Sequence, residues 1–125
     1  MLAKGTFEVN IVPQQDRLVP GLGRMTIDKT FSGDLAGESR GQMLSGGNFK
    51  TGSAGYVAME SFTGSLFGKQ GGFIMQHSAV MHQGAENLSV TIVPGSGSGE
   101  LAGIAGSLSI AIKDKQHYYD LEYTL

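Results

Sequence analysis

The stretch of sequence that decides the fold is Tyr56-Val-Ala-Met-Glu-Ser-Phe-Thr-Gly-Ser-Leu-Phe-Gly68, followed two residues later by Gly71-Gly-Phe-Ile-Met-Gln-His-Ser-Ala-Val-Met-His82. In both segments apolar side chains alternate with small or polar ones, which is the period of a strand with one buried face. Between them stand Lys69 and Gln70, flanked by glycines. Two residues in this setting predict a tight hairpin turn that joins two antiparallel strands.

The more apolar face of this hairpin also carries one carboxylate and one imidazole. Pairing through a turn at Lys69 and Gln70 places Phe62 opposite His77 and Glu60 opposite Ala79. Glu60 therefore lies diagonal to His77. We expect this face to line the interior of the fold. An acid beside an imidazole among apolar side chains is a ligand-binding site, a proton-transfer pair or a structural hydrogen bond.

The same period of two recurs along the whole chain of 125 residues. Apolar alternation marks further strands around residues 7–11, 25–31, 88–92, 108–112 and 119–125, with a less regular one over residues 35–44. A three-residue turn at residues 32–34, just before the irregular strand, would keep Phe31 and Leu35 on one face of the sheet. Glu38 and Arg40 would then lie on the other face.

Eight strands joined mostly by short hairpins leave exposed sheet edges unless the sheet closes on itself. The sequence therefore predicts an all-β fold, a closed eight-stranded and mostly antiparallel β-barrel, as a single domain over residues 1–125. Helical periodicity is almost absent, and at most one short helical turn is expected, at Ser98 to Ala102. Glu100 in that segment is expected to accept backbone hydrogen bonds that hold a sharp bend.

Composition excludes several classes of function. The formal charge is −2, with nine basic and eleven acidic residues and no basic run, so nucleic acid is not an expected partner. There is no cysteine, and the three histidines have no ligand spacing, so we expect neither a metal nor another cofactor. No apolar stretch is long enough to span a membrane, and no secretory segment is visible. We therefore expect a cytoplasmic protein that does not bind membranes.

The outer face of the central hairpin is not fully polar. Met59 is expected to lie opposite Val80, and other apolar residues share this face. They are Val57, Phe67, Ile74 and Val93. An apolar patch on the outside of a barrel predicts a partner, most simply a second copy in a homo-oligomer.

Four segments resemble a bacterial family of small proteins, the domain of unknown function 3224. They are Lys29-Thr-Phe-Ser-Gly-Asp-Leu35, the run from Tyr56 through Glu60 to Gln76-His77, Val93-Pro-Gly-Ser-Gly-Ser-Gly-Glu-Leu-Ala-Gly103 continuing to Gly106, and Tyr119-Asp-Leu-Glu-Tyr123. The resemblance implies a closed β-barrel similar to those of allene oxide cyclases and plant dirigent proteins, and it implies no established activity. Because that kinship is one of fold, no catalytic residue of a cyclase is carried over.

Three functions remain open. The first is a module that binds a small hydrophobic or amphipathic ligand inside the barrel, with Glu60 and His77 as polar anchors. Its apolar walls would be Phe62, Phe73, Met75 and Tyr119. The second is a cofactor-free isomerase or cyclase that uses the same pocket, with Glu60 or His77 moving a proton. The third is a structural homo-oligomer whose barrel is completely filled by side chains.

Overall fold

The computed structural model describes residues 1–15 and 19–125, and all regular structure in them is β. The strands are β1 (Leu2–Pro13), β2 (Leu22–Gly33), β3 (Leu35–Asn48), β4 (Ser53–Leu66), β5 (Lys69–His82), β6 (Ala85–Ile92), β7 (Ser98–Gly99), β8 (Ala105–Lys113) and β9 (Gln116–Thr124). No helix long and apolar enough to cross a membrane occurs among the described residues.

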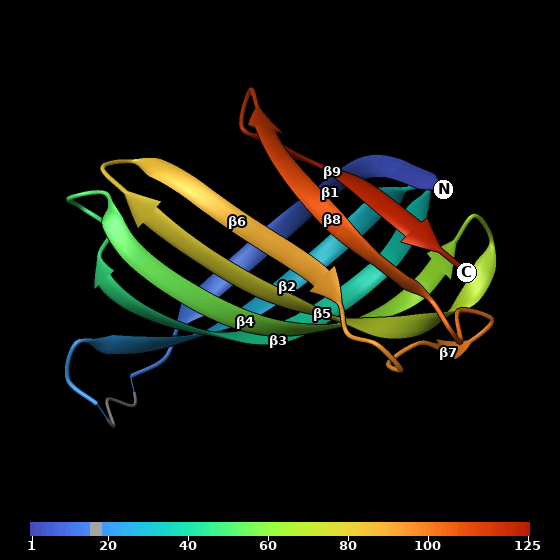
Figure 1. Cartoon of the computed structure of the whole chain (residues 1–125), viewed down its shortest axis with the longest axis horizontal. Coiled ribbons are helices and arrows are strands. Elements are labelled where there is room, and N and C mark those ends of the chain that lie inside the picture. Colours follow the sequence, from blue (N-terminus) through green and yellow to red (C-terminus); the bar gives the residue numbers. More distant parts are fainter. Residues whose placement is uncertain (16–18) are drawn as a thin grey trace.

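The sheet closes into a barrel, as the sequence predicts (Figure 1). The strand order is β4-β3-β2-β1-β9-β8-β6-β5, and pairing of β4 with β5 closes the ring; the short β7 adds to β5. All pairs are antiparallel. Closure pairs the strand edges that an open sheet of this length would expose.

The predicted turn of the central hairpin was wrong by two residues. The turn lies at Phe67 and Gly68, both of which have positive φ angles, of 48° and 81°. A two-residue turn with positive φ at both positions matches the twist of the strands, and glycine adopts that conformation without steric cost. Lys69 and Gln70, which contain no glycine, belong to β5 instead.

The shifted turn changes the partners of the site residues but not their face. Phe62 pairs with Phe73, Glu60 with Met75, and Ala58 with His77. The predicted opposite partners were therefore wrong. Because the partner of each residue shifts by four, an even number, the same side chains still face inward, and Glu60 still lies diagonal to His77.

Two further expectations concern less regular segments. In β3 the predicted faces are confirmed, because Phe31 and Leu35 are buried whereas Glu38 and Arg40 are exposed. The helical turn expected at residues 98–102 does not form: this segment holds the short β7 and successive turns.

The connection between β6 and β8 closes one end of the barrel. Leu101 and Ile104 in this connection are fully buried against the core. Glu100 Oε1 accepts a hydrogen bond from the backbone N–H of Gln70 at 3.0 Å, which confirms its predicted role in the bend. This end also holds the aromatic core, including Phe31, a ring that packs against both the Phe62 and Tyr119 rings.

Candidate functional site

The interior of the barrel has two different halves. The end closed by the β6–β8 connection is filled by buried apolar side chains. The other end, toward the β1–β2, β3–β4, β5–β6 and β8–β9 turns, contains a cavity of about 190 Å³. Its lining is mostly apolar, with a few polar groups; the residues are Phe7, Val9, Ile11, Ile27, Lys29, Met43, Tyr56, Ala58, His77, Glu86, Leu88, Ile110, Ile112 and His117.

The barrel wall has its fewest strand pairings between β6 and β8. Strands β6 and β8 share a single residue pair in the described structure, Thr91 with Ser107. Beyond that pair the two strands diverge toward their turns (Figure 1). Leu88 on β6 and Ile110 on β8, the two strands that diverge, both line the cavity.

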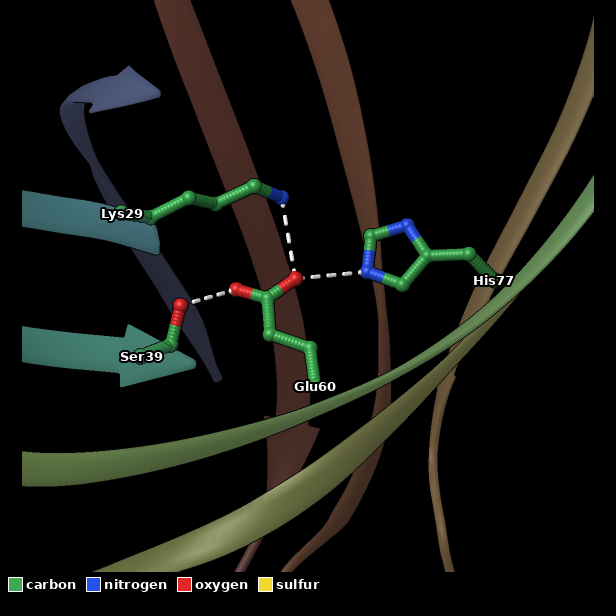
Figure 2. A network of polar contacts seen from close by, with 4 residues as sticks. All are labelled: Lys29, Ser39, Glu60 and His77. Carbon is green, nitrogen blue, oxygen red and sulfur yellow. Dashed lines mark hydrogen bonds and ion pairs between the residues drawn. The ribbon is translucent and has the colours of Figure 1, made fainter. Parts of the chain in front are cut away.

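A buried polar network lies at the junction of the two halves. Glu60 on β4 has no exposed surface, and three strands bring partners to its carboxylate (Figure 2). Lys29 Nζ on β2 lies 2.9 Å from Glu60 Oε1, and His77 Nε2 on β5 lies 2.7 Å from the same oxygen. The hydroxyl of Ser39 on β3 donates a hydrogen bond to Oε2. Both carboxylate oxygens therefore have charged or polar partners.

These partners keep Glu60 ionised. Burial alone raises the pKa of this carboxyl group, because the charged form loses its hydration. The hydrogen bond from His77, the positive charge of Lys29 and the hydrogen bond from Ser39 outweigh burial and lower the pKa of Glu60 from its ordinary value of 4.5 to about 2. At neutral pH, Glu60 is a carboxylate that accepts hydrogen bonds only.

The ionised carboxylate fixes the tautomer of His77. Since Glu60 Oε1 has no proton to give, His77 Nε2 must carry the hydrogen in their 2.7 Å contact. In neutral His77 the other ring nitrogen, Nδ1, then carries a lone pair. Nδ1 makes no hydrogen bond to the described residues. Because every fully buried side-chain nitrogen or oxygen atom in those residues has a hydrogen-bond partner, Nδ1 is not fully buried. His77 also lines the cavity. Nδ1 is thus the ring nitrogen that a ligand can reach.

Lys29 also faces the cavity. Its ammonium lies 4.8 Å from the centre of the Phe7 ring, within range of a cation–π interaction. Of its three N–H donors, the contact with Glu60 occupies one. Lys29 and His77 therefore present polar groups to the cavity, whereas Glu60 and Ser39 lie behind them and do not line it.

Comparison with known proteins places the chain in a family. Residues 3–123 match the model described as protein of unknown function (DUF3224). The chain belongs to the DUF3224 family. It is similar to a crystal structure of a DUF3224 protein of unknown function from Shewanella oneidensis MR-1, with 42% sequence identity and a TM-score of 0.94, over 100% of this chain and 96% of the other. No curated protein matches it.

In this DUF3224 barrel the predicted site residues fall into two groups. Glu60 and His77 come together, as expected from the sequence. The four predicted wall residues are instead buried in or beside the packed half, and none lines the cavity; they are Phe62, Phe73, Met75 and Tyr119. The Tyr119 hydroxyl accepts a hydrogen bond from the Leu35 backbone N–H at 2.9 Å, a structural role. Core packing explains the burial of these four residues.

Two members of the network were missed by the sequence analysis. Lys29 stands between Ile27 and Phe31 at a position that alternation turns inward, and Ser39 occupies an inward position of β3. The signal that could have identified Lys29 is its place among inward-facing apolar residues of its strand. An inward lysine in a chain that also has an inward glutamate indicates an internal ion pair. Ser39 carried no comparable signal, because small residues fill both faces of its strand.

The cavity lining includes further titratable groups, Tyr56, Glu86 and His117. Burial, and secondarily the negative charge of Glu86, raises the pKa of the Tyr56 hydroxyl. The His117 ring packs at 5.0 Å from the Phe7 ring. No group of three or more metal-ligating His, Asp or Glu side chains occurs among the described residues. The absence of a metal or other cofactor in the working protein remains a prediction.

The outer face of the hairpin keeps its apolar character with a changed register. Met59 pairs with Gln76, and Val80 pairs with Gly55, so the predicted pairing of Met59 with Val80 was wrong. Met59 and Val80 are nevertheless both exposed, as are two other predicted members of the patch, Val57 and Phe67. Homo-oligomer formation through this face remains a prediction.

Proposed function

We propose that this protein binds a small amphipathic molecule in the open half of its barrel. The observation that carries the proposal is an apolar cavity with Lys29 and His77 at its inner end, both held by one buried carboxylate. Buried ion pairs seldom stabilise a fold more than well-packed apolar residues do. Their presence beside a cavity is therefore better explained by recognition of a ligand's polar group than by stability.

The size of the cavity limits the ligand. Its volume of about 190 Å³ is somewhat larger than the roughly 150 Å³ of an engineered apolar cavity that accepts benzene. It is smaller than the roughly 300 Å³ at which pockets for drug-sized molecules begin. A single substituted ring or a short branched chain fits these bounds, with its apolar part against Val9, Ile27 and Ile110.

A cofactor-free isomerase or cyclase is the second candidate. The specific observation that favours it is the contact between Glu60 and His77 Nε2, because a carboxylate that orients an imidazole is a common arrangement for a general base. His77 would then move the proton. Glu60 would act as a positioning residue, since it lies outside the cavity lining and a pKa of about 2 suits it poorly to proton transfer near neutral pH.

Native mass spectrometry of the purified protein tests the binding proposal. We expect a small molecule in stoichiometric amount, released under denaturing conditions. Val9→Trp fills the cavity and should abolish the bound mass. Val12→Trp is the matched control, because the exposed Val12 lies on the same strand outside the cavity lining, and it should retain the bound mass.

An empty protein would move the test to added probes. A small aromatic molecule, 4-nitroanisole, should then bind to wild type and to Val12→Trp, and not to Val9→Trp, by isothermal titration calorimetry. An empty wild-type protein that also fails to bind this probe would contradict the proposal and favour a purely structural barrel.

A further inference from the structure

The inner end of the cavity presents two unlike groups to one small region. Lys29 Nζ and His77 Nε2 contact the same oxygen of Glu60, so their side chains are neighbours. Figure 2 shows the second ring nitrogen of His77 and the Lys29 ammonium on the same side of the carboxylate. A ligand oxygen bound on that side meets a cation and an imidazole nitrogen together.

The protonation pattern selects the kind of oxygen. Glu60 is ionised and occupies the Nε2–H of His77, so neutral His77 offers a lone pair at Nδ1. This lone pair accepts hydrogen bonds, so the ligand atom that contacts Nδ1 must carry a hydrogen. The ammonium of Lys29 meanwhile favours negative charge on the same oxygen. A base and a cation that face one site favour a ligand whose O–H group can give its proton to the base and keep the negative charge on oxygen.

Resting on the proposed function, we infer that the cavity binds a weak oxygen acid, a phenol or an enol, and transfers its proton to His77. The O–H bond of the ligand breaks, and its bonding electrons remain on oxygen, which becomes an oxyanion beside Lys29 Nζ. A new N–H bond forms at His77 Nδ1, and the imidazolium keeps its Nε2–H···Oε1 contact with Glu60. The net charge of the complex does not change.

The other charges around His77 favour this class over two alternatives. A carboxylic acid is already ionised at neutral pH and would bring a negative charge into a cavity that Glu86 also lines, and toward a lone pair on Nδ1. A cationic ligand would meet the ammonium of Lys29. Tyr56 and His117 also line the cavity, where their side chains can exchange hydrogen bonds with a ligand. A neutral O–H ligand avoids both costs.

Paired probes test the inference. 4-Nitrophenol carries the O–H group, and its anion absorbs visible light, whereas its neutral form absorbs in the near ultraviolet. 4-Nitroanisole has similar size and no O–H group. At a pH where about half of free 4-nitrophenol is ionised, we expect about nine-tenths of the bound probe to be ionised. This corresponds to a rise of about tenfold or more in its acid ionisation constant, or about one pKa unit.

Variants assign the effect to the two groups. Lys29→Met should reduce the ionised fraction of bound 4-nitrophenol, and so should His77→Gln, whose amide N–H keeps a donor for Glu60 but offers no base. Lys4→Met is the matched control: it removes one positive charge from an exposed side chain outside the cavity, and it should leave the spectrum of the bound probe unchanged. If Lys29→Met fails to fold, as judged by circular dichroism, His77→Gln alone decides.

The outcomes separate this inference from the proposed function. Binding of both probes with equal affinity, and with 4-nitrophenol ionised no more than in solution, would overturn the inference and leave the binding cavity intact. Binding of neither probe would overturn the inference and count against the cavity as a site for small aromatic molecules. An ionised bound 4-nitrophenol whose spectrum survives in both Lys29→Met and His77→Gln would overturn the assignment to these residues.

Discussion

The two halves of the barrel interior are built from the same strands and differ in how completely side chains fill them. In the closed half, aromatic and aliphatic side chains such as Phe62 and Leu121 fill the space and have at most 1% of their surface exposed. In the open half, the same strands present half-buried residues such as Val9 and Ile110 to a cavity. The Glu60 network lies between them. The difference predicts that the closed half contributes more to stability, and it leaves space for the proposed ligand in the open half.

The comparison predicts that truncations cost most in the closed half. Phe62→Ala should lower the free energy of unfolding by about 3–5 kcal/mol, because it removes a large buried side chain and leaves a void. Ile110→Ala, at the cavity wall, should cost less than half as much, because its side chain already borders empty space. Urea denaturation followed by circular dichroism measures both. Equal losses would contradict the division into two halves.

The effects of substitutions in the Glu60 network on stability should depend on one another, because its partners all surround one negative charge. Lys29→Met leaves the buried Glu60 carboxylate with a weakened set of partners and should cost about 3–5 kcal/mol. The double variant Lys29→Met/Glu60→Gln removes both charges and should recover part of that loss. A double variant that is less stable than Lys29→Met alone would show that the carboxylate is not the source of the cost.

Acid should remove the stabilising contribution of the Glu60 carboxylate, whereas the packing of apolar side chains does not depend on pH. The folded-state pKa of Glu60, about 2, lies below its ordinary value of 4.5, so its contribution to stability is present above pH 4.5 and is lost as the pH falls from 4.5 toward 2. The full contribution is about 3 kcal/mol. The difference in unfolding free energy between wild type and Glu60→Gln, measured across this window, should shrink by that order. A constant difference would contradict the lowered pKa.

The smallest effect on stability is expected on the outer face, which belongs to neither half. Val57→Lys changes an exposed side chain and should alter the free energy of unfolding by no more than about 0.5 kcal/mol. It should nevertheless convert a homo-oligomer to monomers in analytical ultracentrifugation, if the patch that includes Val57 and Met59 is the interface. Thr63→Lys, at another exposed outward position of β4, is the control and should keep the assembly. A monomeric wild type would contradict the predicted assembly.

Much of the fold was accessible from alternation alone, and the errors are informative. The turn at Phe67 and Gly68 was placed two residues too late, since the flanking glycines pointed to Lys69 and Gln70. The error displaced the predicted partners without inverting the faces, because side chains repeat every two residues. This is why Glu60 and His77 were correctly placed side by side although their opposite partners were not.

The sequence by itself determined that this chain is an all-β barrel and that one acid and one histidine face its interior. Both follow from local rules, the period of a strand and the chemistry of turns. Only the tertiary structure decided which end of the barrel is filled, and that Lys29 and Ser39 reach Glu60 from strands 31 and 21 residues away in the chain. Barrel closure sets these long-range contacts, and no local pattern encodes them.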